Sequence, residues 1–216
     1  SSQPSFVGMM GDLRHRLDQV RHATGGHLQQ HIADYIGRHQ SAVAQLASCS
    51  ADIEDLAQRC IAALQRGNKL LICGNGGSAA DAQHMAAELV GRFISDRAAI
   101  PAVALTTDTS ALTAIANDYG YDAVFSRQVA ALANAGDVLL AISTSGNSKS
   151  VIAACDEARR LGCEAVGLSG RDGGLLRNHC DALVVAPSDE TAHIQECHIV
   201  VIHLLCGLIE SGLGLV

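Results

Sequence analysis

Five short, almost uninterrupted apolar runs alternate with longer helical patterns over the last two thirds of the chain. A loop rich in Gly, Ser, Thr or Asp follows each run. A strand that is apolar on both faces needs a layer of helices above and below it. The sequence therefore predicts an α/β fold, a doubly wound α/β/α sandwich around a five-stranded parallel sheet. The predicted strands are Leu70–Cys73, Ala102–Leu105, Val138–Ile142, Ala165–Leu168 and Ala182–Val185.

Helical periodicity accounts for most of the remaining chain. Before the first strand, one helical pattern ends at Thr24-Gly25-Gly26 and a second follows it. A third helix is predicted to start with Ser50 as its cap and to end at Gly67. Further helices are expected at 78–93, 109–116, 122–135, 148–161 and 174–178, and a long apolar helix at 188–210.

With 216 residues, 48% of them hydrophobic and 17% charged, the chain fits one globular domain. We expect residues 28–216 to form that domain with its N-terminal helices, and 9–27 to be a helical N-terminal extension. Residues 1–8 lack the basic start and apolar core of a secretory signal, and we interpret them as a cloning scar.

The composition excludes several classes of partner. The net charge is -7 with scattered Lys and Arg and no Trp, which argues against nucleic acid. The longest apolar run, Ile199–Ile209, is interrupted by His203 and is shorter than the about 18 residues that a membrane span requires. Eight cysteines without a CxxC pair indicate reduced core residues. We therefore expect a cytoplasmic protein.

Two loops between a predicted strand and a helix have the chemistry of anion sites. Gly74-Asn75-Gly76-Gly77-Ser78 combines three glycines with a hydroxyl at a helix start, although a tight turn alone would explain it equally well. The loop lacks the P-loop lysine and the third glycine of the dinucleotide motif. The segment 143–148 offers four hydroxyls where a single helix cap needs one, which favours a phosphate monoester. These hydroxyls belong to Ser143, Thr144, Ser145 and Ser148.

Polar side chains interrupt two apolar helices. His84 and Glu88 are four residues apart and share one helix face, which suits either metal ligation and proton transfer or an ordinary ion pair. Asp81 lies on the same helix as a candidate partner that orients His84. In the last helix, His203 is surrounded by aliphatic residues, and an imidazole buried there needs a partner. Helical angles favour Glu196 over Gln195 as that companion.

Four stretches resemble the sugar isomerase (SIS) domain family, most closely its members that isomerise heptose phosphates. They read GNGGSAADAQHMAAEL at 74–89, AIANDYGYDAVFSRQV at 114–129, GDVLLAISTSGNS at 136–148 and IQECHIVVIHLLCGLIE at 194–210. Together with the fold between them, the resemblance covers about residues 28–212. It implies a bacterial homotetramer held by N- and C-terminal helices, with active sites between subunits.

The activity implied by the resemblance is an aldose–ketose isomerisation. It would interconvert D-sedoheptulose 7-phosphate and D-glycero-D-manno-heptose 7-phosphate through an ene-diol, the first step of ADP-heptose synthesis for the lipopolysaccharide core. The alternative is a non-catalytic SIS protein that binds a phosphosugar or associates with a replication initiator. Such a protein needs no acid–base pair, whereas Glu88 and His203 are both present here, which favours the enzyme.

The resemblance also implies roles for individual residues. Proton transfer falls on Glu88 and His203. The expected zinc ligands are His84, Glu88, Gln195 and His203. Substrate contacts are expected from Glu88 and from Asn75, Gly76, Gly77, Ser78, Asn117, Asp118, Ser143, Thr144, Ser145, Ser148 and Gln195.

Elementary chemistry limits two of these roles. A histidine nitrogen bound to a metal cannot donate a proton, so the two roles of His203 compete. Gln195 and His203 are eight residues apart, about 12 Å along a helix axis. They would reach one metal only when extended toward each other or when contributed by different subunits, and glutamine is a poor zinc ligand.

Overall fold

The computed structural model describes the backbone from Phe6 to Val216 and the side chains from Gly26 onward. The chain divides into two compact units, residues 1–41 and 42–216. A single helix, α1 (Phe6–Gln45), accounts for the described part of the first unit. The predicted scar 1–8 lies partly outside the described residues. The predicted domain boundaries at 9–27 and 28–216 stay predictions.

The helix break expected at Thr24-Gly25-Gly26 is wrong, because α1 runs through these residues without interruption. A glycine inside a helix costs only about 1 kcal/mol relative to alanine and keeps its backbone hydrogen bonds. Flanking helical segments on both sides therefore carry the helix across the pair. α1 ends instead where a short 3-10 helix, η1 (Leu46–Cys49), turns the chain toward the next helix.

The second unit contains the predicted parallel sheet. Its strand order is β2-β1-β3-β4-β5, and every neighbouring pair is parallel. The strands β1 and β3 are buried along their whole length, which explains their unbroken apolar sequences. The strands are β1 (Leu70–Gly74), β2 (Ala102–Ala104), β3 (Val138–Ile142), β4 (Glu164–Gly170) and β5 (Ala182–Ala186).

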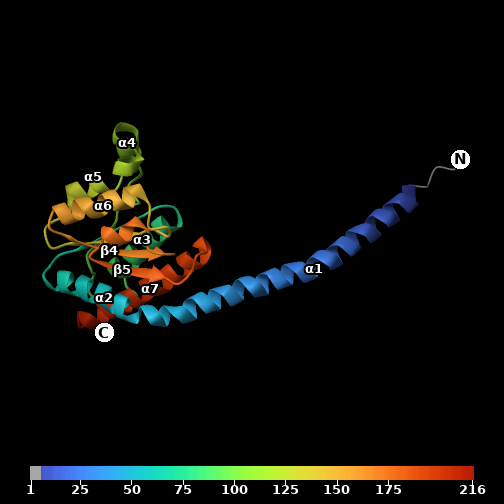
Figure 1. Ribbon diagram of the computed structural model, residues 1–216, viewed down its shortest axis with the longest axis horizontal. Coiled ribbons are helices and arrows are strands. Elements are labelled where there is room, and N and C mark those ends of the chain that lie inside the picture. The colour runs from blue at the N-terminus through green and yellow to red at the C-terminus, as the bar shows by residue number, and fades with distance from the viewer. Residues whose placement is uncertain (1–5) are drawn as a thin grey trace. The chain divides into compact units, whose positions relative to one another are not determined.

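Helices cover both faces of this sheet, so the doubly wound sandwich is confirmed (Figure 1). One face packs against α2 (Ser50–Gln65), α3 (Gly77–Val90) and α7 (Thr191–Gly212). The other face packs against α5 (Ser126–Leu132) and α6 (Lys149–Arg160). The 3-10 helix η2 (Tyr121–Ala123) lies at the start of the helix predicted at 122–135. A second 3-10 helix, η3 (Leu175–Asn178), lies where a short helix was predicted at 174–178.

Ser50 does not cap α2 as predicted. Its hydroxyl donates a hydrogen bond to the carbonyl of Ala47 at 2.7 Å, while Cys49 holds the cap position without a side-chain bond. Because η1 already delivers a helical backbone into α2, Ser50 has helical dihedral angles and faces back along the chain. The predicted end of α2 is correct, since Gly67 follows it with a positive φ of 83°.

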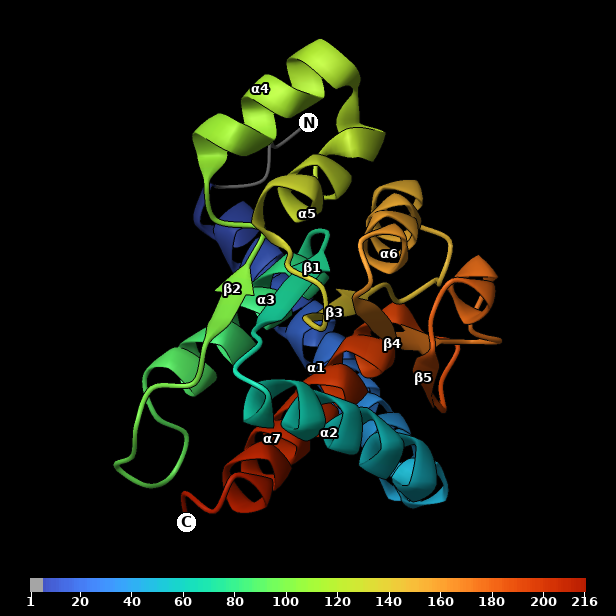
Figure 2. The ribbon, with the colours of Figure 1, turned by 90° about the vertical axis from the view of Figure 1, so that its left-hand side faces the viewer.

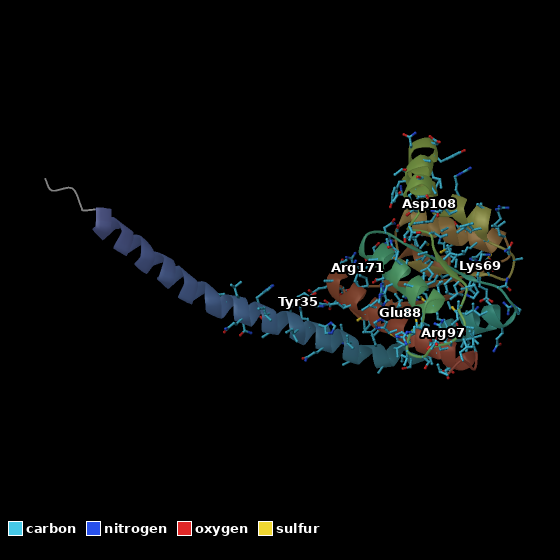
Figure 3. The ribbon with its side chains drawn as sticks, turned by 180° about the vertical axis from the view of Figure 1, so that it is seen from behind. Tyr35, Lys69, Glu88, Arg97, Asp108 and Arg171 are labelled. Atoms are coloured by element: carbon cyan, nitrogen blue, oxygen red, sulfur yellow. The ribbon has the colours of Figure 1, made fainter. Side chains whose placement is uncertain are left out.

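The helix α4 (Thr109–Tyr119) stands away from the sheet and has no buried residue (Figure 2). Asp108, labelled at its foot in Figure 3, caps it by accepting a bond from the backbone of Ala111 at 2.9 Å. Local capping therefore stabilises an element that the rest of its own chain hardly covers.

The length and composition of α7 would allow it to cross a bilayer, alone among the helices in the described part of the chain. Half of its most apolar stretch is buried within the fold, where it packs on α2 and α3. This is the packing of a core helix. The cysteines are also core residues, since all eight are free and seven are buried.

Candidate active site

The two predicted anion loops lie side by side at the switch point of the sheet. In the order β2-β1-β3-β4-β5, the chain winds away in opposite directions from β1 and β3, and doubly wound folds bind ligands beyond that point. A cavity of about 180 Å³ opens there. Its lining has no charged residue and comprises Asn75, Ser78, Ile142, Ser143, Thr144, Ser145, Ser148 and Gln195.

Two helix N-termini point at this cavity. Ser78 lies in the first turn of α3, and Ser148 is the cap residue of α6. The unpaired N–H groups and the dipole of a helix start favour an anion. Gly146 bends the second loop with a φ of 66°, and a side chain there would collide with the carbonyl of Gly173. Size and chemistry together suit one phosphate group better than a whole sugar.

A chain of hydrogen bonds fixes the rim of the cavity. The Asn75 amide donates to Ser148 Oγ at 2.8 Å and to Ser150 Oγ at 3.0 Å. The hydroxyl of Tyr121 donates to Asn75 Oδ1 at 2.7 Å. Asn75 is therefore oriented from both sides, and it links the loop after β1 to the loop after β3.

Gln195 closes the cavity from α7. Its amide lies so close to Gly77 that any side chain at position 77 would overlap it. A side chain at position 77 would therefore force the Gln195 amide to move. Gln195 lies at this end of the helix pair, among the hydroxyls, and its predicted role as a metal ligand stays a prediction.

Farther along the same two helices, His84, Glu88 and His203 converge. The Nε2 atoms of His84 and His203 are 2.9 Å apart, and His84 Nε2 is 3.4 Å from Glu88 Oε1. The ligating atoms of all three lie within 4.8 Å of one another. Residues from α3 and α7 thus meet as one cluster, which we call the histidine cluster.

The histidine cluster has the donor set of a catalytic zinc site. Two imidazoles and one carboxylate leave a fourth position for water or substrate. Ligands about 2.0–2.1 Å from a tetrahedral ion lie about 3.3 Å from one another. The 2.9 and 3.4 Å separations are close to that value. These residues therefore fit zinc.

Burial perturbs one titratable group on each of α3 and α7, Asp81 and His198. Desolvation raises the pKa of Asp81 to about 6, and the nearby His84 lowers it less. Asp81 Oδ2 is buried without a hydrogen bond, and the contacts of His84 Nε2 are with His203 and Glu88. Desolvation also lowers the pKa of His198 to about 4, although a bond to the Ser169 carbonyl opposes the shift.

His203 is exposed in the chain, contrary to the expectation that the aliphatic residues around it bury it. The face of α7 that carries His203, Leu204 and Leu208 is not covered by the described fold and borders a cavity of about 470 Å³. The ring of Phe93 stacks on His203 at 5.6 Å. Glu196, the companion favoured by helical angles, instead bonds His193 at 2.7 Å.

Among the predicted substrate contacts, Gly76, Gly77 and Glu88 do not line the cavity, although all three lie on α3 or in the loop before it. Asn117 and Asp118 do not line it either. Both lie on the exposed α4, where the Asn117 amide donates to Asp118 at 2.8 Å. Sequence reasoning missed Tyr121, Ser150 and Phe93. Tyr121 lies within a stretch that carries the family resemblance, which is the only signal that pointed toward it.

Comparison with known proteins agrees with this geometry. The sequence profile described as SIS domain matches residues 34–170, so the chain is an SIS-domain protein. The phosphoheptose isomerase of Aliarcobacter butzleri is 54% identical over 183 residues, which are 85% of this chain and 97% of the relative. The chain belongs to the phosphoheptose isomerase family.

Solved structures extend the agreement to the fold. The phosphoheptose isomerase of Neisseria gonorrhoeae has a TM-score of 0.81 and 46% identity, covering 85% of this chain and 99% of the other. That of Francisella tularensis has a TM-score of 0.82 and 38% identity, covering 84% and 97%.

Proposed function

We propose that this protein interconverts D-sedoheptulose 7-phosphate and D-glycero-D-manno-heptose 7-phosphate. One observation carries the proposal: the α3–α7 helix pair holds a hydroxyl-lined anion cavity at one end and the histidine cluster farther along. A phosphosugar has the same arrangement, with an anion at one end and a reactive carbonyl at the other. The names of the relatives support the choice of a heptose.

The phosphate would occupy the cavity at the switch point. Ser143, Ser145 and Ser148 offer hydroxyl donors there, and two helix N-termini supply the favourable dipoles. No basic side chain is required, which suits a substrate that must also leave. Because the phosphate does not react, these contacts serve mainly to hold the sugar in place.

Glu88 and His203 would carry out the isomerisation. In the direction from ketose to aldose, Glu88 takes a proton from C1 to form the ene-diol and returns it to C2. The C2 oxygen gains a proton as the ene-diol forms, and the C1 hydroxyl loses its proton as the aldehyde forms. His203 would donate the first of these protons and accept the second. A non-catalytic phosphosugar-binding protein would not need the two groups to converge, and the 2.9 and 3.4 Å contacts join them through His84.

We propose zinc as the cofactor, held by His84, Glu88 and His203, which leave a fourth position for substrate. Ligation of the metal by Gln195 stays a prediction. When bound, zinc would polarise the substrate oxygens as a Lewis acid. The nitrogen of His203 that binds the metal cannot also donate a proton. His203 therefore acts on the proton only through its other nitrogen or in a state without that bond.

The active enzyme is proposed to be a homotetramer with active sites between subunits. Leu204 and Leu208 on α7 are 47% and 42% exposed, and both line the cavity of about 470 Å³ together with Phe93 and Val200. A contiguous apolar face of this kind is typical of an interface between copies. Asn117 and Asp118 on the uncovered α4 are then available to complete the site of a neighbouring copy.

We also propose a compartment and a pathway. Eight free thiols suit a reducing compartment, so we propose the bacterial cytoplasm. The product aldose would enter ADP-heptose synthesis for the lipopolysaccharide core.

Proton NMR tests the proposed activity directly. Purified protein incubated with sedoheptulose 7-phosphate is expected to produce the anomeric signals of the aldose phosphate until equilibrium is reached. Fructose 6-phosphate and sedoheptulose without phosphate serve as matched controls for chain length and for the anion cavity. Binding of sedoheptulose 7-phosphate without any aldose signal would favour the non-catalytic alternative.

A further inference from the structure

A buried ion pair lies directly behind the histidine cluster. Arg97 and Glu210 are each only 2% exposed in their side chains, and Arg97 Nε is 2.8 Å from Glu210 Oε1. Arg97 comes from the loop after α3, and Glu210 from the end of α7. Figure 3 shows Arg97 beside Glu88 and next to α7.

The guanidinium of Arg97 caps the C-terminal end of α3. A helix end leaves carbonyl groups without partners, and a cation there satisfies both the hydrogen bonds and the dipole. Arg97 Nη2 donates to the backbone carbonyl of Glu88 at 2.8 Å. Its Nη1 donates to the carbonyls of Leu89 at 2.8 Å, Gly91 at 3.0 Å and Ala98 at 3.1 Å.

Glu210 extends the same network to His203. Besides Arg97, its Oε1 accepts a bond from the backbone N–H of Phe93 at 3.3 Å. The Phe93 ring stacks on the imidazole of His203 with an interplanar angle of 27°. His203 and Glu210 are seven residues apart on α7, two helical turns, and lie on the same side of the helix.

We propose that the Arg97–Glu210 pair is a positioning device that fixes the Glu88 and His203 side chains relative to each other. It holds Glu88 through the backbone of the last α3 turn and His203 through the stacked Phe93. One rigid unit then controls both groups, and a displacement of about 1 Å can cost about a hundredfold in rate. The inference rests on the proposed function.

The test is a double substitution, Arg97→Met with Glu210→Leu, which removes both charges together. Replacing a buried pair by apolar residues of similar size is often neutral for stability. We expect a folded protein whose kcat falls about 10- to 100-fold while KM changes less than about twofold. KM is spared because Ser78 and Glu88 are ten residues apart, about 15 Å along α3.

Two further variants separate positioning from general structure. Glu210→Gln keeps the acceptor oxygen, so it is expected to retain most of the wild-type kcat. The double substitution Arg160→Met with Glu157→Leu removes an exposed pair at the far end of α6, with a 2.7 Å contact, and should change neither constant. An unchanged kcat in the folded Arg97 and Glu210 double variant would overturn the proposal.

If the double variant does not fold, Phe93→Leu tests the contact between Phe93 and His203 while the ion pair stays in place. We expect the ring-proton resonances of His203 to shift and kcat to fall about tenfold, while Phe93→Tyr restores both. A wild-type protein that turns over no substrate would reject the proposed function. The His203 resonances would still report on positioning in that case. Wild-type kcat and unshifted resonances in Phe93→Leu would contradict the proposed device.

Discussion

Glu88→Gln is expected to remove turnover of sedoheptulose 7-phosphate while leaving the fold intact. The amide is nearly isosteric with the carboxylate but cannot accept a proton, and a positioned general base contributes about 10²- to 10⁴-fold to the rate. Glu88 is well placed for this task, because its side chain is partly exposed beside His84 and His203. The initial rate of aldose formation by NMR measures the effect.

Asp96→Asn is the matched control for this variant. Asp96 is an exposed carboxylate in the loop after α3, outside the histidine cluster, so its loss should leave the rate unchanged. Thermal unfolding of both variants checks that the fold is retained. Since Glu88 is also a proposed metal ligand, the metal content of the variant is measured in the same sample. A variant that retains metal but not turnover identifies Glu88 as the base, and full activity would reject that role.

Removal of metal is expected to have an effect of similar size. Elemental analysis should find about one zinc per chain, because the histidine cluster supplies a three-ligand set of the catalytic type. Dialysis against a chelator should abolish turnover, and stoichiometric zinc should restore it. The expected loss follows from the loss of polarisation at the substrate oxygens.

His84→Ala distinguishes this site from adventitious binding. It should lower both zinc content and activity, because it removes an imidazole from the histidine cluster. His179→Ala removes a surface histidine that pairs with Asp156 at 2.6 Å, and should change neither. Turnover that persists after the protein is verified to be metal-free would exclude a catalytic role for zinc.

Sequence predicted the sheet well because its strands are determined by local pattern. The strand β3 has the bounds predicted from its apolar run, and the others differ by one or two residues at their ends. The hydroxyl-rich loop 143–148 was recognisable because four hydroxyls exceed the needs of a cap. Because β1 and β3 are parallel neighbours in the sheet, the loops that follow them lie side by side.

The rest of the site depends on contacts that no local pattern records. The last helix is apolar on nearly every side, so periodicity could not tell that the His203 face is left uncovered. The contact between Gln195 and Gly77 joins residues more than a hundred positions apart. Arg97 lies in a loop without periodicity, and its partners come from α3, α7 and the loop itself. These arrangements result from tertiary packing alone.

A crystal structure of Glu88→Gln with bound sedoheptulose 7-phosphate tests the central claim most directly. We expect the phosphate among Ser143, Ser145 and Ser148, and C1 and C2 of the sugar between residue 88 and His203. The two protein groups should belong to one site once all neighbouring subunits are included. A phosphate bound elsewhere, or a carbonyl end that points away from both groups, would contradict the account.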